Sequence, residues 1–213
     1  MITVWGRATS SNVQLVMWAI AELGLECERL DFGGAFGKTN TPEYFAMNPN
    51  RLVPVIRDGD GPYLWESAAI VRYLAARYGD HHFWPTDPQV RAVVDKWAEW
   101  TKTTFVPAFI GGVFLPIITK RPEERDESVI ANGVAKLKSA VAIFETGVPE
   151  NGFFGGEGLC FADVICGAYL FRYFDLEFER GHTPHLAAFY KRLTMRPHFV
   201  RHVMISYDSL RAR

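Results

Sequence analysis

A short strand entered through a proline, and followed by a helix that opens on an acidic residue and a serine, constrains this 213-residue sequence most. The stretch runs Asn-Pro-Asn-Arg-Leu-Val-Pro-Val-Ile over residues 48–56, and continues Leu-Trp-Glu-Ser-Ala-Ala-Ile over 64–70. Pro54 has no N–H for a sheet, which favours a fixed turn ahead of the strand, with a cis bond as one option. Val53 can then offer its own N–H and C=O to an extended ligand, as an added strand would.

The start of the next predicted helix supplies complementary groups. Ser67 stands where that helix begins, so its hydroxyl and the free N–H groups of the first turn can bind a carboxylate. Glu66 beside it can pair with an ammonium. Residues 53–67 therefore predict a site for an amino acid or a short peptide that carries both charges.

Residues 1–80 alternate between strand and helix patterns. Ile2–Trp5 is a short apolar strand, a helix with one apolar face follows Asn12, and Cys27–Phe32 predicts a second strand. A glycine-rich loop leads to a short turn around Pro42, and a hairpin and a closing helix complete the segment. The order β-α-β-α-β-β-α is thioredoxin-like, with a parallel right-handed first crossover and an antiparallel last hairpin.

Residues 81–88 form the predicted linker, because they are polar and carry two prolines. Residues 89–213 show helical periodicity only, and Phe161–Phe174 is apolar nearly all round, which is typical of a helix at the centre of a bundle. We expect an α/β domain followed by an all-α helical bundle. The predicted helices of the second domain cover residues 90–105, 123–144, 161–174, 184–193 and 199–205.

Charge and cysteine content exclude several classes of protein. The formal net charge is −1, so nothing points to nucleic acid or to an anionic membrane surface. The longest apolar runs are interrupted by charges or proline, so we expect no membrane span. Cys27, Cys160 and Cys166 lack metal-ligand spacing; we expect no metal site, and reduced thiols in a cytoplasmic protein.

The pattern Asn-Pro, Val-Pro, Glu-Ser-x-Ala-Ile and Tyr73-Leu74 resembles the glutathione-binding half of the soluble glutathione transferases. The resemblance covers the whole chain, since Asp163 and Arg196-Pro197 match features of the helical half. It implies a bacterial-like, serine-type transferase with a phi- or theta-like site, glutathione as co-substrate, and a homodimer. Cys160 stands where relatives have Ser or Thr at the helix start; Asp163 can still accept a backbone N–H there.

The resemblance also indicates where the thiol of glutathione is activated. Its thiolate is the nucleophile, and a hydroxyl that donates to the sulfur stabilises the charged form. Counted from Gly6 at the strand end, Ser10 falls on the phi-class serine; counted back from Val13 of the helix, the position would be Arg7, which has no hydroxyl. Ser10 is therefore the first candidate, Ser11 the second and Thr9 the third, with helix capping as the alternative role.

Other ligand contacts follow from the same resemblance. Val53-Pro54 would pair with the cysteinyl backbone, and Glu66 with Ser67 would hold the γ-glutamyl end. Lys38 is a candidate for the glycyl carboxylate. Leu52 replaces the usual Gln or Lys ahead of Val-Pro, so that contact is lost or is taken over by Arg51.

The helical domain should select the electrophile. Aromatic side chains are dense enough there to line an apolar cleft that faces Ser10, although aromatics at helical spacing more often form core. Gly111-Gly112 is expected to break that helix. The candidates for this wall are Trp97, Trp100, Phe105, Phe109 and Phe114.

Three functions remain open from the sequence. The first is conjugation of glutathione to small apolar electrophiles. The second is glutathione-dependent disulfide reduction or peroxidase activity, although no cysteine lies in the loop before the first helix. The third is a non-catalytic glutathione-binding regulatory or assembly module. Calorimetry with glutathione together with a broad electrophile panel separates binding from turnover.

Overall fold

The computed structural model describes residues 1–212, and its first domain is built on a mixed four-stranded sheet. The spatial order is β2-β1-β3-β4, with β1 parallel to β2, and β3 antiparallel to both β1 and β4. This arrangement confirms the predicted parallel crossover and antiparallel hairpin. The strands are β1 (Ile2–Trp5), β2 (Cys27–Leu30), β3 (Val55–Asp58) and β4 (Tyr63–Trp65).

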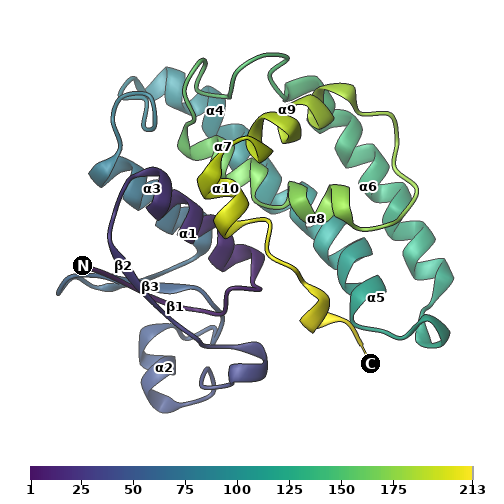
Figure 1. Cartoon of the computed structure of the whole chain (residues 1–213), viewed down its shortest axis with the longest axis horizontal. Helices are drawn as coiled ribbons and strands as arrows, with labels where there is room; N and C mark the ends of the chain where they lie inside the picture. The colour runs from purple at the N-terminus through teal and green to yellow at the C-terminus, as the bar shows by residue number, and fades with distance from the viewer. Residues whose placement is uncertain (213) are drawn as a thin grey trace.

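Three helices complete the thioredoxin-like domain: α1 (Ser11–Glu22), α2 (Pro42–Met47) and α3 (Ser67–Tyr78). Helices α1 and α3 lie side by side against the sheet (Figure 1). Most apolar side chains of α1 are fully buried and Met17 is partly buried, which follows from the apolar face in its sequence. Gly24, just after the end of α1, adopts φ +65°, a conformation that favours glycine at a helix C-terminus.

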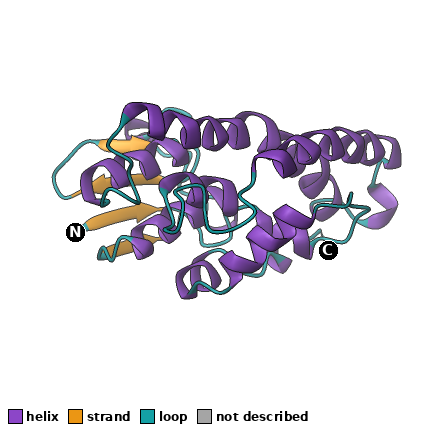
Figure 2. Cartoon of the chain, turned by 90° about the horizontal axis from the view of Figure 1, so that it is seen from above, coloured by secondary structure: helices purple, strands orange, loops and turns teal. Residues whose placement is uncertain are grey.

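The second domain is helical, and Figure 2 shows the strands gathered at one end of the molecule with helices filling the rest. Helix α4 (Pro88–Trp100) continues through π-helical turns, Thr101–Phe105 and Pro107–Phe114, into α5 (Leu115–Ile118). The 31-residue run Pro88–Ile118 is long and apolar enough, by length and composition, to cross a bilayer. Lys102, Pro107 and Pro116 do not interrupt this helix, so charges and prolines do not exclude a long apolar run here; length and composition alone do not make it a membrane span. The run packs against α6 and α7, which buries 33% of its most apolar stretch.

The remaining helices surround this run. Three short 3-10 turns, Gly34–Phe36, Pro122–Glu124 and Asp208–Leu210, lie in the connections. All side chains from Phe161 to Leu170 are buried, which confirms the central position predicted for this segment. The helices are α6 (Glu127–Gly147), α7 (Phe161–Gly167), α8 (Leu170–Asp175), α9 (Pro184–Thr194) and α10 (Pro197–His202).

Gly112 does not break its helix, contrary to the sequence expectation. It lies in the π-helical turn and packs against Gly133 of α6, where an added Cβ would stand 2.0 Å from the Gly112 carbonyl oxygen. Two glycines thus allow two helix backbones to touch. Gly112 and Gly133 allow the two helices to pack closely. The contact between the helices outweighs the low helix propensity of glycine.

Asp163 fixes the start of α7, as the sequence predicts. Its carboxylate accepts the amide N–H of Cys160 (2.8 Å) and that of Phe154 (2.8 Å). The carboxyl is fully buried, and burial raises its pKa to about 6. Asp163 therefore holds the loop before α7 and the helix itself in one arrangement.

Candidate functional site

The loop between β1 and α1 carries the candidate catalytic serines. Gly6 allows the chain to leave β1 close to α1, because an added Cβ would stand 2.4 Å from Val13 Cγ2. The amide of Arg7 donates to the Phe32 carbonyl (3.0 Å), so Arg7 still belongs to the strand end. Ser10 is the residue directly ahead of α1. The structure therefore places Ser10, and not Arg7, at the helix start.

The hydroxyl of Ser10 is not used in capping. Ser10 has the extended backbone of an N-cap residue, and its carbonyl accepts the amides of Val13 and Gln14, but its side chain makes no cap hydrogen bond. The amides of Ser11 and Asn12 find no acceptor within residues 1–212. The Ser10 hydroxyl and two helix N–H groups are therefore free to bind a ligand at this end of α1.

Val53 presents its backbone beside this loop. The Val53–Pro54 peptide bond is cis. In the described part of the chain, the N–H and C=O of Val53 take part in no hydrogen bond. Its Cβ lies 3.4 Å from a Cβ added at Gly6, so the free peptide group is next to the loop between β1 and α1. This is the geometry that strand-like pairing with an extended ligand requires.

The start of α3 supplies the second end of the site. Glu66 caps α3 in the left-handed region, at φ 68°, and its side chain is exposed and makes no ion pair with any described residue. Ser67 is the first helical residue and is only 2% exposed. Its hydroxyl donates to Asn12 Oδ1 (3.2 Å), which ties the start of α3 to α1.

Lys102, which the sequence analysis missed, joins this group from the helical domain. Its Nζ donates to Asn12 Oδ1 (2.8 Å), Ser67 Oγ (3.2 Å) and the Tyr169 hydroxyl (2.9 Å). No carboxylate among residues 1–212 lies within 4.0 Å of it, so the ammonium has only neutral acceptors. A sequence signal existed, because Lys102 is the only cationic residue between Trp97 and Thr119.

Within the described chain, the residues predicted to contact the glycyl carboxylate of glutathione make no hydrogen bond or ion pair with one another. Lys38 is exposed and lies near the end of β2, with Nζ 3.5 Å from the Asp31 carbonyl and 5.1 Å from the Phe32 ring. The guanidinium of Arg51 lies 5.2 Å from the Phe45 ring. The side chain of Leu52 is exposed, and only its carbonyl is engaged, by Tyr44 and Asn48.

The candidate electrophile residues lie in the interior of the helical domain. Phe105 and Phe109 have no exposed surface, and their rings stack at 5.8 Å. Trp97 and Trp100 are half-buried and both pack against Phe144 of α6. Phe105 and Phe109 therefore have the burial of core residues, the alternative role of aromatics at helical spacing, whereas Trp97 and Trp100 keep part of their surface exposed. Phe114 is also fully buried, beneath the guanidinium of Arg172 (4.9 Å).

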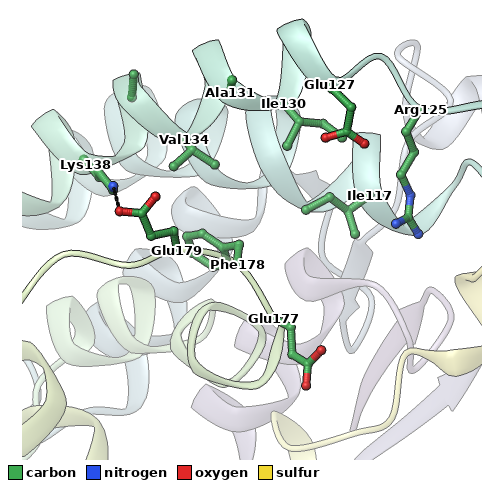
Figure 3. A pocket seen from close by; sticks show the side chains of 11 residues that line it. Ile117, Arg125, Glu127, Ile130, Ala131, Val134, Lys138, Glu177, Phe178 and Glu179 are labelled. Atoms are coloured by element: carbon green, nitrogen blue, oxygen red, sulfur yellow. Dashed lines mark hydrogen bonds and ion pairs between the residues drawn. The ribbon is translucent and has the colours of Figure 1, made fainter. Parts of the chain in front are cut away.

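A separate hollow of about 480 Å³ lies between α6 and residues 177–179 (Figure 3). Ile117, Ile130 and Phe178 form its apolar part, and the ion pair Lys138–Glu179 (2.7 Å) stands at one edge. None of the predicted site residues lines it. Among residues 1–212, no group of three or more His, Cys, Asp or Glu side chains is placed to hold a metal ion.

Comparison with known proteins identifies the family. Residues 9–77 match the model of the glutathione S-transferase N-terminal domain, and residues 93–197 match that of the C-terminal domain. Glutathione S-transferase GstB of Escherichia coli is 35% identical over 206 residues, which cover 96% of this chain and 99% of that protein. The chain belongs to the glutathione S-transferase family.

Solved structures place this glutathione S-transferase family member in the same fold. A theta-class glutathione S-transferase from Xanthomonas axonopodis pv. citri, with glutathione bound, superposes with a TM-score of 0.90 at 38% identity, over 96% of this chain and 98% of that one. Glutathione S-transferase F14 of Arabidopsis thaliana is 28% identical over 95% of this chain and 80% of its own length. The predicted family and two-domain fold are confirmed.

Proposed function

We propose that this chain conjugates the thiolate of glutathione to small electrophiles, and that the Ser10 hydroxyl stabilises the thiolate. The decisive observation is that Ser10 stands at the N-terminus of α1 with its hydroxyl unused, beside the free amides of Ser11 and Asn12. These groups favour a negative charge at the same point. Ser11 is the second candidate, because it opens the same helix.

The two ends of glutathione fit the remaining groups. The free peptide group of Val53 next to Pro54 would pair with the cysteinyl backbone. Glu66 would hold the γ-glutamyl ammonium, and Ser67 with Lys102 the carboxylate beside it. Lys38 and Arg51 are the cations that would pair with the glycyl carboxylate.

The main chemical requirement for conjugation is ionisation of the glutathione thiol. A free thiol has a pKa of about 8.5, so only a few per cent is ionised at pH 7. Each unit by which the site lowers that pKa corresponds to about 1.4 kcal/mol of preference for the thiolate. The sulfur then attacks an electrophilic carbon while the leaving group departs. Activity toward a generic aryl halide tests the proposal, and glutathione binding without turnover on a broad electrophile panel would contradict it.

The Lys102→Met substitution tests the γ-glutamyl end. We expect the Kd for glutathione to rise about tenfold or more, because a charge-assisted bond to the carboxylate contributes about 1.5–3 kcal/mol. Calorimetry measures the change, and an analogue of glutathione that lacks the γ-glutamyl α-carboxylate should bind both proteins equally. Lys96→Met is the matched control, since Lys96 is an exposed lysine of α4. An unchanged Kd for glutathione would remove Lys102 from the site.

We also propose that the chain acts as a cytoplasmic homodimer. Large apolar side chains stay exposed on both domains: Leu52 at 65%, Val90 at 54% and Val93 at 58%. A two-fold dimer would cover such surfaces. Light scattering should give about twice the chain mass of 24.1 kDa, and a monomer mass at micromolar concentration would refute the dimer. Cys27, Cys160 and Cys166 are unpaired, which suits a reducing compartment.

A further inference from the structure

Two arginines, one from each domain, contact the loop that carries Ser10. Arg172 of α8 donates from Nη2 to the Thr9 carbonyl (2.6 Å). Arg7 opens the same loop, and its carbonyl accepts the amide of Ser10 (3.1 Å). Both arginines are therefore bonded directly to the segment that positions the candidate catalytic hydroxyl.

Neither guanidinium is neutralised within residues 1–212. No carboxylate oxygen of the described chain lies within 4.0 Å of Arg7 or Arg172. The Nε of each arginine is buried and has no hydrogen-bond partner. Arg172 as a whole is only 4% exposed, so water does not readily reach its guanidinium. The rings of Phe114 (4.9 Å) and Tyr207 (5.9 Å) lie against Arg172, but a ring face satisfies no in-plane N–H. Burial and the charge of Arg7 lower the pKa of Arg172 to about 10, so Arg172 remains a cation at neutral pH.

The guanidinium of Arg7 lies close to Val53. A Cβ added at Gly33 would stand 3.2 Å from Val53 Cγ1 and 3.7 Å from Arg7 Nη1. The head of Arg7 is thus next to Val53, the residue proposed to pair with the cysteinyl backbone. Arg172 reaches the same loop from α8 of the helical domain, through its hydrogen bond to the Thr9 carbonyl.

Unpaired guanidinium groups with buried donors are suited to an anion, and their planar forks match a carboxylate. Ser10 and two helix amides already serve a sulfur, so the guanidinium pair is available to the other reactant. The aromatic candidates Phe105 and Phe109 have no exposed surface, so their rings offer no wall to an electrophile. We propose that Arg7 and Arg172 bind a carboxylate on the electrophile and make the enzyme selective for anionic electrophiles. This inference rests on the proposed transferase function and names its substrate class.

The reaction itself is an ordinary substitution. The thiolate sulfur forms a bond to the carbon that bears the halide, and the halide leaves with the electrons of the broken carbon–halogen bond. The thiol proton has gone to solvent in the ionisation step. The carboxylate of the electrophile is unchanged, and the arginines hold it while the reacting carbon meets the sulfur.

A matched pair of electrophiles tests the inference: a chloronitrobenzoate and the corresponding chloronitrobenzamide, each with its rate divided by the uncatalysed rate. In the wild-type enzyme we expect kcat/KM to favour the benzoate by about tenfold or more, the effect of one charge-assisted contact. Arg172→Gln and Arg7→Gln should bring the ratio near one, while Arg172→Lys should keep part of it. Arg180→Gln is the matched control, because Arg180 donates only to backbone carbonyls of residues 173–176.

The possible outcomes distinguish failure of this inference from failure of the proposed transferase function. If wild-type enzyme turns over neither probe nor the neutral chlorodinitrobenzene, the transferase proposal fails. If it turns over the neutral halide but shows no preference for the benzoate, only the inference fails. An equal loss for both probes in Arg172→Gln, with a raised thiol pKa of bound glutathione, would mean that the pair acts on the sulfur and would also overturn it. Circular dichroism confirms folding, and Arg7→Gln carries the test if Arg172→Gln does not fold.

Discussion

Replacing Ser10 with alanine should lower kcat/KM at neutral pH by about 100-fold, the range that a positioned proton donor contributes. The hydroxyl of Ser10 makes no cap bond, so its removal should cost α1 little while the thiolate loses its donor. The thiol pKa of bound glutathione should rise toward the free value of about 8.5. Ultraviolet titration of the thiolate measures this pKa, and steady-state kinetics with an aryl halide measure the rate.

Ser11→Ala is the matched control for this prediction, since it removes a neighbouring hydroxyl from the same helix start. We expect a much smaller change in both the thiol pKa and the rate. If Ser11→Ala has the larger effect, the catalytic role moves to Ser11. If neither variant changes either quantity, the serine mechanism is wrong for this enzyme, and the helix amides alone must stabilise the thiolate.

Asp163→Ala should destabilise the protein by about 3–5 kcal/mol, because it leaves one buried and one partly buried amide without an acceptor and opens a small cavity. Cys160 and Phe154 lose their acceptor together, at the start of the fully buried helix α7. Urea denaturation followed by circular dichroism gives the free energy of unfolding.

The control for Asp163 is Asp126→Ala. Asp126 caps α6 through the amides of Ser128 and Val129, but it does so at the surface. Loss of an exposed cap typically costs about 1 kcal/mol. Equal losses in the two variants would show that burial of Asp163 adds nothing, and would contradict its assigned structural role.

The sequence predicts the fold well where local pattern and tertiary environment agree. The β-branched strands, the apolar face of α1 and the carboxylate cap at Asp163 are such places. It fails at Gly111-Gly112, where glycine suggests a break. There the helix continues because Gly133 offers a close partner from another helix, and no local signal reports that contact.

The sequence predicts only the part of the candidate site whose residues lie close together in the chain. Val53, Pro54, Glu66 and Ser67 lie close in sequence, so their grouping follows from local structure. Lys102 and Arg172 reach the site across the domain boundary, and only the packing of α4 and α8 places them there. Phe105 and Phe109 are candidates from the sequence that the structure buries. Helical periodicity cannot distinguish a core aromatic from one that lines a cleft.

The hydrogen bonds among Asn12, Ser67, Lys102 and Tyr169 have a thermodynamic consequence, because they join the two domains at the point where glutathione is expected. A ligand that takes over Lys102 as an ion partner binds to both domains at once. Occupancy and domain docking are then coupled, and the coupling is reciprocal. A substitution that loosens the domains should weaken glutathione binding, and bound glutathione should make the two domains unfold as one cooperative unit.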